Sequence, residues 1–141
     1  MNYTENYQRP QWEKTDRIVM EDFNTAFRTV EEQMLECTRI AVGSYTGNNA
    51  ASWFINLGLT PAAVFVCTQE GYTRNNTSYL GGLAVSGHPM TVTVGYNSPQ
   101  TILEVTDGGF NVYSDEGETH PSVFIATNRD PQVFHYIAFF A

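Results

Sequence analysis

Apolar side chains recur at steps of three and four residues between Met20 and Cys37, in the stretch MEDFNTAFRTVEEQMLEC. This spacing places the apolar residues on one face of an α-helix and leaves most charged residues elsewhere on its surface. Asp22 is positioned to be the N-cap, because its short carboxylate accepts a hydrogen bond from the free amides of a first helical turn. The pattern predicts one amphipathic helix, with an apolar stripe of Phe23, Ala26, Phe27, Val30, Met34 and Cys37.

Beyond Arg39 the apolar period changes to two, and clusters of Gly, Pro, Asn and Ser interrupt it regularly. Asp107-Gly108 is the strongest hairpin signal, and its turn is expected to hold two residues at positive φ. The last strand is apolar on both faces near its end, which indicates a central or intersubunit position. Nine strands are predicted, at about 40–45, 52–57, 63–68, 79–85, 91–96, 102–106, 110–113, 123–127 and 133–140.

Short strands at this spacing predict a mainly β fold, an antiparallel β-sandwich, and favour jelly-roll wiring over a closed barrel. The pattern alone leaves the strand order open. We therefore divide the chain into an N-terminal attachment arm and helix, residues 1–38, and a β-sandwich domain, residues 39–141.

The first 15 residues contain Pro10 and have no sustained period, so they are expected to form an extended arm. Aromatic rings are costly to leave in water, and an arm that carries several of them usually lies on a partner. That partner is the chain's own helix, a sister subunit or another protein. The predicted docking residues are Tyr3, Tyr7, Trp12 and Ile18.

The helix resembles two heptads of a short coiled coil, because Phe23, Val30 and Cys37 are seven residues apart and Ala26 and Gln33 form a second seam. Two heptads are fewer than the three or four that make a coiled coil secure. Packing of this face on the arm or on the β-domain is therefore an equal alternative. The predicted oligomer-interface residues are Phe23, Phe27, Val30 and, from the last strand, Phe139.

The net charge of −8 and the pI near 4.6 change the picture of possible partners. Nucleic-acid binding requires a basic surface, and only seven Lys and Arg residues are scattered along the chain, so no nucleic-acid partner is predicted. No apolar run approaches the roughly 18 residues of a membrane span, and no secretion signal opens the sequence, so no membrane insertion is expected. Cys37 and Cys67 lack a CxxC spacing and are expected to be buried, reduced thiols.

Motifs for catalysis and metal binding are missing from the sequence. The three histidines lie far apart without HxH or HExxH spacing, and the acidic run at residues 114–118 lacks the spacing of a calcium loop. A serine elbow, a phosphate loop and a Cys–His dyad are equally absent. The sequence predicts no catalytic residue, no metal site and no cofactor, and a protein that is not an enzyme.

Tyrosines near predicted loops are candidates for ligand binding, because a flat ring offers a stacking surface for sugars or a wedge for a protein partner. Tyr72 and Tyr79 flank the polar loop QEGYTRNNTSY, and Tyr96 and Tyr113 end predicted strands. The alternative is that these rings close the ends of the sandwich. The predicted ligand-binding residues are Tyr72, Tyr79 and Tyr96.

Several stretches resemble a known group of proteins. The opening YTENYQRPQWEKTDRIVMEDFNTAF resembles the N-terminal segment of tail-fibre and other virion-associated proteins of phages and prophages of gut Firmicutes. GSYTGNNAASWFINLGLTPAAVFV, GGLAV, TDGGFNVY and FHYIAFFA are similar to a β-sandwich module at the ends of such proteins. The resemblance implies a structural virion protein, usually homotrimeric, whose arm and helix attach it to other virion proteins while its β-domain faces outward.

The leading functional hypothesis is accordingly a virion protein that is assembled in the bacterial cytoplasm and has a host-surface glycan as its candidate ligand. No long fibrous shaft follows Cys37, which favours a fibre tip, a baseplate appendage or a capsid decoration over a long tail fibre. A free-standing, lectin-like carbohydrate-binding module is the alternative. A glycan-cleaving enzyme is a weaker third hypothesis, because it requires a pair of carboxylates held in a cleft.

Overall fold

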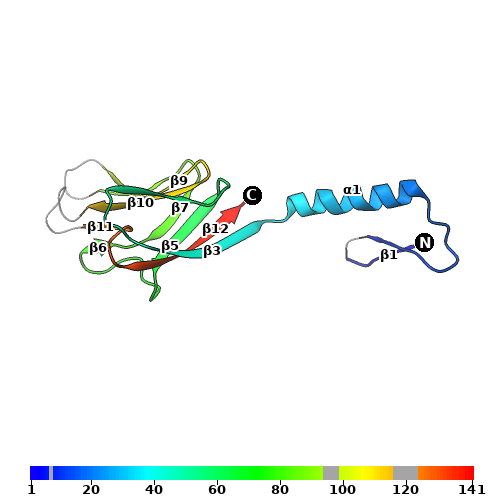
Figure 1. The fold of residues 1–141 in the computed structure, drawn as a ribbon, viewed down its shortest axis with the longest axis horizontal. Helices are drawn as coiled ribbons and strands as arrows, with labels where there is room; N and C mark the ends of the chain where they lie inside the picture. The colour runs from blue at the N-terminus through cyan, green and yellow to red at the C-terminus, as the bar shows by residue number, and fades with distance from the viewer. Residues whose placement is uncertain (7, 94–98, 116–123) are drawn as a thin grey trace. The chain divides into compact units, whose positions relative to one another are not determined.

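The structure, a computed structural model of the 141-residue chain, describes residues 1–6, 8–93, 99–115 and 124–141. The chain divides into two compact units, Met1–Cys37 and Thr38–Ala141 (Figure 1). The boundary between them falls one residue before the predicted one. The described part of the chain is mainly β, and its one α-helix belongs to the first unit.

The first unit opens with two short strands, β1 (Asn2–Tyr3) and β2 (Pro10–Gln11), that pair antiparallel. The amide of Thr4 donates to the Arg9 carbonyl at 2.8 Å, and the amide of Arg9 donates to Thr4 Oγ1 at 2.8 Å. Gln8 has a φ of 52°, in the left-handed region that suits a chain reversal. The segment predicted as an extended arm is thus not extended throughout, because these hydrogen bonds return β2 alongside β1.

The helix of the first unit, α1 (Met20–Glu36), covers the predicted stretch but lacks the predicted cap. Val19 precedes its first turn, no side chain among the described residues caps it, and Asp22 lies inside the turn. At that position the negative charge of Asp22 interacts favourably with the positive end of the helix dipole, and so stabilises the helix electrostatically. None of the residues of α1, all of them described, is buried, and the Cys37 thiol that was predicted to be buried is exposed.

The second unit contains a four-stranded sheet with the order β3-β12-β5-β7, in which all neighbours are antiparallel. Its strands are β3 (Arg39–Thr46), β12 (Val133–Phe140), β5 (Ala63–Thr68) and β7 (Gly82–Val85). β12 pairs with β3 along its whole length and with β5 on its other side. Of the two positions predicted for the last strand, the structure shows the central one.

A six-stranded sheet forms the other half of the unit. It has the order β6-β11-β10-β9-β8, with β4 also paired to β10, and all its pairs are antiparallel except the parallel pair of β6 and β11. Its strands are β4 (Ser52–Asn56), β6 (Ser78–Tyr79), β8 (Met90–Val92), β9 (Gln100–Thr106), β10 (Gly109–Asp115) and β11 (Phe124–Ala126).

Two details of the predicted strand pattern are wrong. The strand predicted at 79–85 is two strands, β6 and β7, which belong to different sheets. Between them, Gly81 passes so close to the backbone carbonyl of Val66 that a Cβ would collide with it, so the chain crosses there without a side chain. In the hairpin between β9 and β10, of the two described turn residues only Gly108, at φ 82°, has a positive φ.

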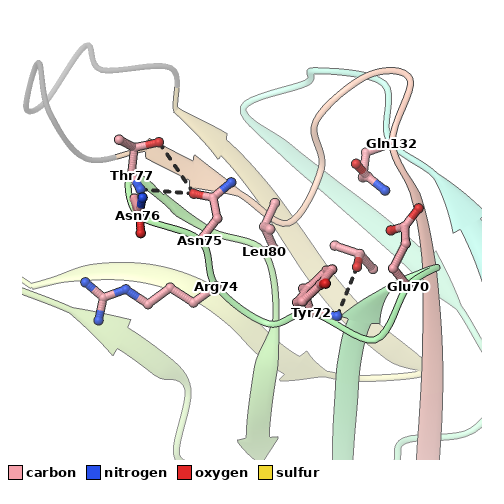
Figure 2. A pocket seen from close by; sticks show the side chains of 9 residues that line it. Glu70, Tyr72, Arg74, Asn75, Asn76, Thr77, Leu80 and Gln132 are labelled. Atoms are coloured by element: carbon pink, nitrogen blue, oxygen red, sulfur yellow. Dashed lines mark hydrogen bonds between the residues drawn. The ribbon is translucent and has the colours of Figure 1, made fainter.

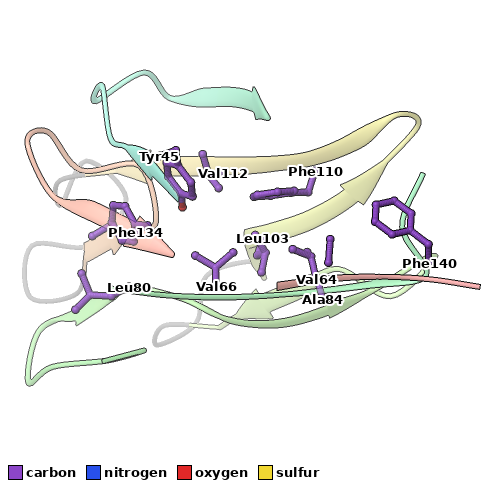
Figure 3. Close-up of a cluster of buried hydrophobic side chains, with 12 residues drawn as sticks. Tyr45, Val64, Val66, Leu80, Ala84, Leu103, Phe110, Val112, Phe134 and Phe140 are labelled. Carbon is purple, nitrogen blue, oxygen red and sulfur yellow. The ribbon is translucent and has the colours of Figure 1, made fainter. Parts of the chain in front are cut away.

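The inner faces of the two sheets share one hydrophobic core, in which side chains from both sheets point toward one another (Figure 3). Tyr45 joins aromatic rings of both sheets: its ring stacks on Phe134 with centroids 5.0 Å apart and meets Phe110 edge-on at 6.3 Å. The Tyr45 hydroxyl donates to the Thr127 carbonyl at 2.6 Å, so the phenol is paired although it is buried. Burial raises the pKa of Tyr45 far above its ordinary value.

A second tyrosine gives a prediction about alkaline pH. Tyr113 donates to Glu104 Oε2 at 2.9 Å, and burial together with this carboxylate raises the pKa of Tyr113 to about 12. Because an unfolded tyrosine ionises near pH 10, the free energy of unfolding should stay level below about pH 10 and fall between about pH 10 and 12. Tyr113→Phe should reduce that fall in urea titrations across this range, and an unchanged pH dependence would contradict the assignment.

Candidate functional site

The outer face of the four-stranded sheet has a large apolar part. Residues that lie opposite one another on neighbouring strands point to the same side of a sheet, so the strand register defines this surface. Two rows of paired residues cross all four strands, and we call these eight residues the apolar face: Ile40, Phe139, Ala63 and Val85 in one row, and Val42, Ile137, Phe65 and Leu83 in the other.

Large side chains of the apolar face are open to solvent within this chain. Val42 is 72% exposed, Ile40 60% and Leu83 55%. None of the eight residues is charged, and the adjoining row continues with His135 beside Cys67, which is half-buried and not buried as predicted. Contiguous apolar surface is typical of the places where proteins contact partners or ligands.

The outer surface of the six-stranded sheet is different, because polar groups occupy its centre. Glu104 and Asn111 lie opposite each other on β9 and β10, and Tyr113 donates its hydroxyl to Glu104. Phe54 on β4, which is 42% exposed, is the large apolar exception. One sheet therefore presents an ordinary solvated surface, whereas the other presents a surface that is suited to burial.

The predicted oligomer-interface residues lie in both units. Phe139 occupies the middle of the apolar face, between Ile40 and Ala63. On α1, Phe27 is exposed, Phe23 is partly exposed and Val30 is half-buried. The other seven residues of the apolar face were missed, although the continuous apolar run of β5 indicated a strand that is covered on both sides.

Only some of the predicted docking residues are exposed to solvent. Tyr3 and Ile18 are exposed, and Tyr7 lies outside the described residues. Trp12 instead stacks on Phe23 of α1, with ring centroids 5.3 Å apart and an interplanar angle of 13°. Three partners were considered for the arm, and Trp12 packs on one of them, the chain's own helix.

A polar side-chain contact also ties the strand pair to the helix. The Arg9 guanidinium Nη2 donates to Gln33 Oε1, so Gln33, the predicted polar residue of the helical seam, is occupied within the unit. The first unit is thus a small folded piece, whose exposed apolar side chains lie mainly on α1: Met20, Phe27, Met34 and Leu35.

The second feature is a hollow at the end of the β-domain where β5 ends and β12 begins (Figure 2). Its volume is about 660 Å³, which is within the range of small-molecule sites. The loop after β5 forms one wall, and Gln132, which directly precedes β12, lies on another. The lining residues are Thr68, Glu70, Tyr72, Arg74, Asn75, Asn76, Thr77, Leu80 and Gln132.

A tight turn fixes the backbone that carries Tyr72 at the hollow. The amide of Tyr72 donates to Thr68 Oγ1 at 3.0 Å, and the amide of Thr68 donates to the Tyr72 carbonyl at 2.8 Å. Gly71 takes a φ of 92°, which favours glycine, and its amide donates to the Thr68 carbonyl at 2.9 Å. The backbone of this turn is therefore fixed, while the Tyr72 side chain is 63% exposed.

A second turn fixes the opposite rim. Asn75 Oδ1 accepts hydrogen bonds from the amides of Thr77 at 3.0 Å and Ser78 at 2.7 Å, and the Asn75 amide donates to the Ser78 carbonyl at 3.0 Å. The side-chain oxygen of Asn75 is thereby used within the turn. Asn76 stands at its tip, and its side chain has no hydrogen-bond partner among the described residues.

Gln132 is positioned by a network of hydrogen bonds around the buried amide of Asn128. This network joins the loop before β12 to residues far earlier in the sequence. Asn128 Nδ2 donates to Asn48 Oδ1 at 2.7 Å and to the Ala50 carbonyl at 3.0 Å, and the amide of Asn48 donates to Asn128 Oδ1 at 3.1 Å. The amide of Gly47 donates to the Gln132 carbonyl at 2.9 Å. The predicted TGNN turn after β3 thus holds the loop before β12 by hydrogen bonds. These bonds position Gln132 at one wall of the hollow.

The three tyrosines predicted as ligand-binding residues do not form one site. Tyr72 lines the hollow, but Tyr79 does not; its ring is covered by the Arg74 guanidinium, 4.6 Å from the ring centroid. Tyr96 lies outside the described residues. Glu70, Arg74 and Gln132 were missed, because nothing in the local pattern indicates that the loops after β5 and before β12 meet.

No group of three or more His, Cys, Asp or Glu side chains is placed to hold a metal ion in residues 1–6, 8–93, 99–115 and 124–141. Within the same ranges, α1 has neither the length nor the apolar character to cross a bilayer.

Comparisons of the chain with protein-family models, with curated proteins and with solved structures found no match.

Proposed function

We propose that this chain is a structural protein of a phage or phage-like particle, placed as a fibre tip, a baseplate appendage or a capsid decoration. The apolar face is the observation that carries the proposal, because contiguous, uncharged apolar surface on an exposed sheet is typical of an interaction site. The β-domain, with its two sheets around one core, is proposed to be a jelly-roll-like sandwich that faces outward. The first unit is proposed to attach it to other virion proteins.

The proposed occupant of the apolar face is a second copy of the chain. Four strands about 4.8 Å apart span roughly 19 Å, and two rows of residues cover roughly 13 Å along them, a plane of about 250 Å². A stable interface buries about 800 Å² on each partner, so the apolar face alone is too small. The exposed apolar side chains of α1 add surface on the same chain, which favours a homo-oligomer that uses both units.

Uncharged surfaces also favour association with an identical copy. The chain carries a net charge of −8, so copies repel each other generally. The apolar face contains no charged residue, and two copies can therefore meet there without bringing like charges together. A homotrimer is the proposed state, on the resemblance to virion proteins described above.

Removal of residues 1–19 tests the attachment role. The truncated chain is expected to form the oligomer and to be missing from particles purified from the phage or prophage that encodes it, since the β-domain has its own core. Mass spectrometry of the particles measures incorporation, and light scattering measures the oligomer. Leu59→Ala, an exposed loop change in the β-domain, is the control and should be incorporated normally.

Two outcomes would overturn this proposal. Normal incorporation of the truncated chain would show that attachment does not use residues 1–19. Absence of the full-length chain from the particles would exclude a virion role altogether.

A free-standing, lectin-like module is the second candidate, and the hollow at Tyr72 is the observation that favours it. Glycan cleavage is less well supported. Hydrolysis by the common mechanism requires two carboxyl groups about 5 to 9.5 Å apart, whereas Glu70 is the only acidic residue among the described residues that line the hollow. The expectation that the chain is not an enzyme stays a prediction.

A further inference from the structure

We propose that the hollow at the end of β5 binds a neutral saccharide, with one sugar ring packed on the exposed face of Tyr72. This inference rests on the proposed outward placement of the β-domain and specifies what that domain binds. It concerns side chains that are gathered from two loops: Glu70, Tyr72, Arg74, Asn76 and Gln132.

Tyr72 provides the stacking surface. Its side chain is 63% exposed, yet its backbone is fixed by hydrogen bonds in both directions to Thr68. Because the backbone is fixed and a tyrosine side chain has only two torsions, ordering its ring on binding costs little conformational entropy. The C–H groups on one face of a sugar ring pack on such a ring while its hydroxyls remain directed outward. In the view of Figure 2, Tyr72 lies between Leu80 and Glu70, which also line the hollow.

The groups around this ring match hydroxyls, which both donate and accept hydrogen bonds. The Glu70 carboxylate accepts, the side-chain amide of Asn76 does both, and neither has a partner among the described residues. The Gln132 amide donates one hydrogen bond to the Val133 carbonyl at 3.2 Å, and its oxygen is an acceptor. Figure 2 places Glu70 and Gln132 on one side of Tyr72 and Asn76 on the other.

The charges in and around the hollow favour a neutral saccharide over an anionic one. Glu70 is in the lining, and the chain as a whole carries −8, so a phosphorylated or uronic-acid polymer would be repelled. Arg74 is the only basic residue among the described lining residues, and its guanidinium lies over the Tyr79 ring. A basic cluster for an anionic ligand is therefore missing from the described part of the hollow.

Polarity excludes a purely apolar ligand. Sites for apolar molecules are lined mainly by hydrophobic side chains, with a few polar groups. Here Tyr72 and Leu80 are the only large apolar side chains among the described lining residues. The remainder carry amide, hydroxyl or charged groups, which suits a ligand that is itself rich in hydroxyls.

The test is isothermal titration calorimetry of the full chain with neutral oligosaccharides built from glucose, galactose, rhamnose or N-acetylglucosamine. Matched phosphorylated and uronic-acid sugars are titrated in parallel. At least one neutral sugar is expected to bind. Tyr72→Ala should raise its Kd by about tenfold, since stacking contributes on the order of 1 kcal/mol. Tyr72→Phe, which keeps the ring, should bind nearly as well as the wild type.

Leu59→Ala is the matched control, because Leu59 is also an exposed loop residue but precedes β5, whereas the hollow follows it. Its affinity should equal that of the wild type. Absence of binding to every neutral sugar at millimolar concentration would overturn the inference, as would equal binding by Tyr72→Ala or a preference for the anionic sugars. Particle incorporation is measured separately, so a negative sugar titration leaves the proposed virion role intact.

Discussion

Ile137→Asp is expected to convert the proposed homo-oligomer into a folded monomer. Ile137 lies on β12 at the centre of the apolar face, with Val42 on one side and Phe65 on the other. A carboxylate there would have to be buried without a partner on association, which costs several kcal/mol per copy. In the isolated subunit the same position is 37% exposed, so the carboxylate remains hydrated and the fold tolerates it. Light scattering measures the mass, and circular dichroism the fold.

Phe54→Asp is the matched control for this experiment. Phe54 is a large apolar residue of a strand with a similar exposure, 42%, but it belongs to the other sheet. It should leave the oligomer intact. A wild-type chain that is monomeric at the same concentration, or an Ile137→Asp variant that keeps the wild-type mass, would contradict self-association through the apolar face.

Phe134→Ala is expected to lower the free energy of unfolding by about 3 to 5 kcal/mol. Phe134 is fully buried and stacks on Tyr45, so its removal leaves a cavity where the two sheets meet. Domains of this size are stable by about 5 to 15 kcal/mol, so the loss threatens the folded state itself. Urea denaturation of the wild type and the variant, followed by circular dichroism, measures the difference.

The comparison for this change is Phe139→Ala on the same strand. Phe139 belongs to the apolar face, and truncating it removes no side chain from the core between the sheets. Measured under conditions where both proteins are monomeric, it should cost clearly less than Phe134→Ala. Equal losses would indicate that the outer row of β12 is as tightly packed within one chain as the inner row.

Period and turn chemistry were sufficient to predict the helix and most strands of the β-domain, but not the pair of β1 and β2. The helix and most strands lie within a few residues of their predicted positions, and β12, predicted to be central or intersubunit, has neighbours on both sides in its sheet. These features depend on residues that are near one another in sequence. The prediction of one strand at 79–85 was wrong, because the strand-like sequence continues through Gly81 without a local break. The chain changes sheets at Gly81, where its backbone passes close to that of Val66.

The candidate sites were harder to predict, because both depend on contacts between distant residues. The apolar face became visible only once the strand order placed Val42 and Leu83 in one row. The hollow depends on Asn128, whose side chain bonds to Asn48 and Ala50 about 80 residues earlier. Local sequence predicted Tyr72 as a stacking ring, but it gave no indication of Glu70 or Gln132 as its neighbours.

The central place of β12 has a consequence for the order of events during synthesis. β3 and β5 both pair with β12, so until residues 133–140 have emerged from the ribosome each of them has an unpaired edge on that side. The middle of the apolar face, Ile137 and Phe139, is supplied by the same strand. In the proposed assembly, a stalled or truncated subunit therefore lacks the centre of its binding surface. Subunit association then acts as a check on completed folding, since only chains that have inserted β12 present a surface that identical copies recognise.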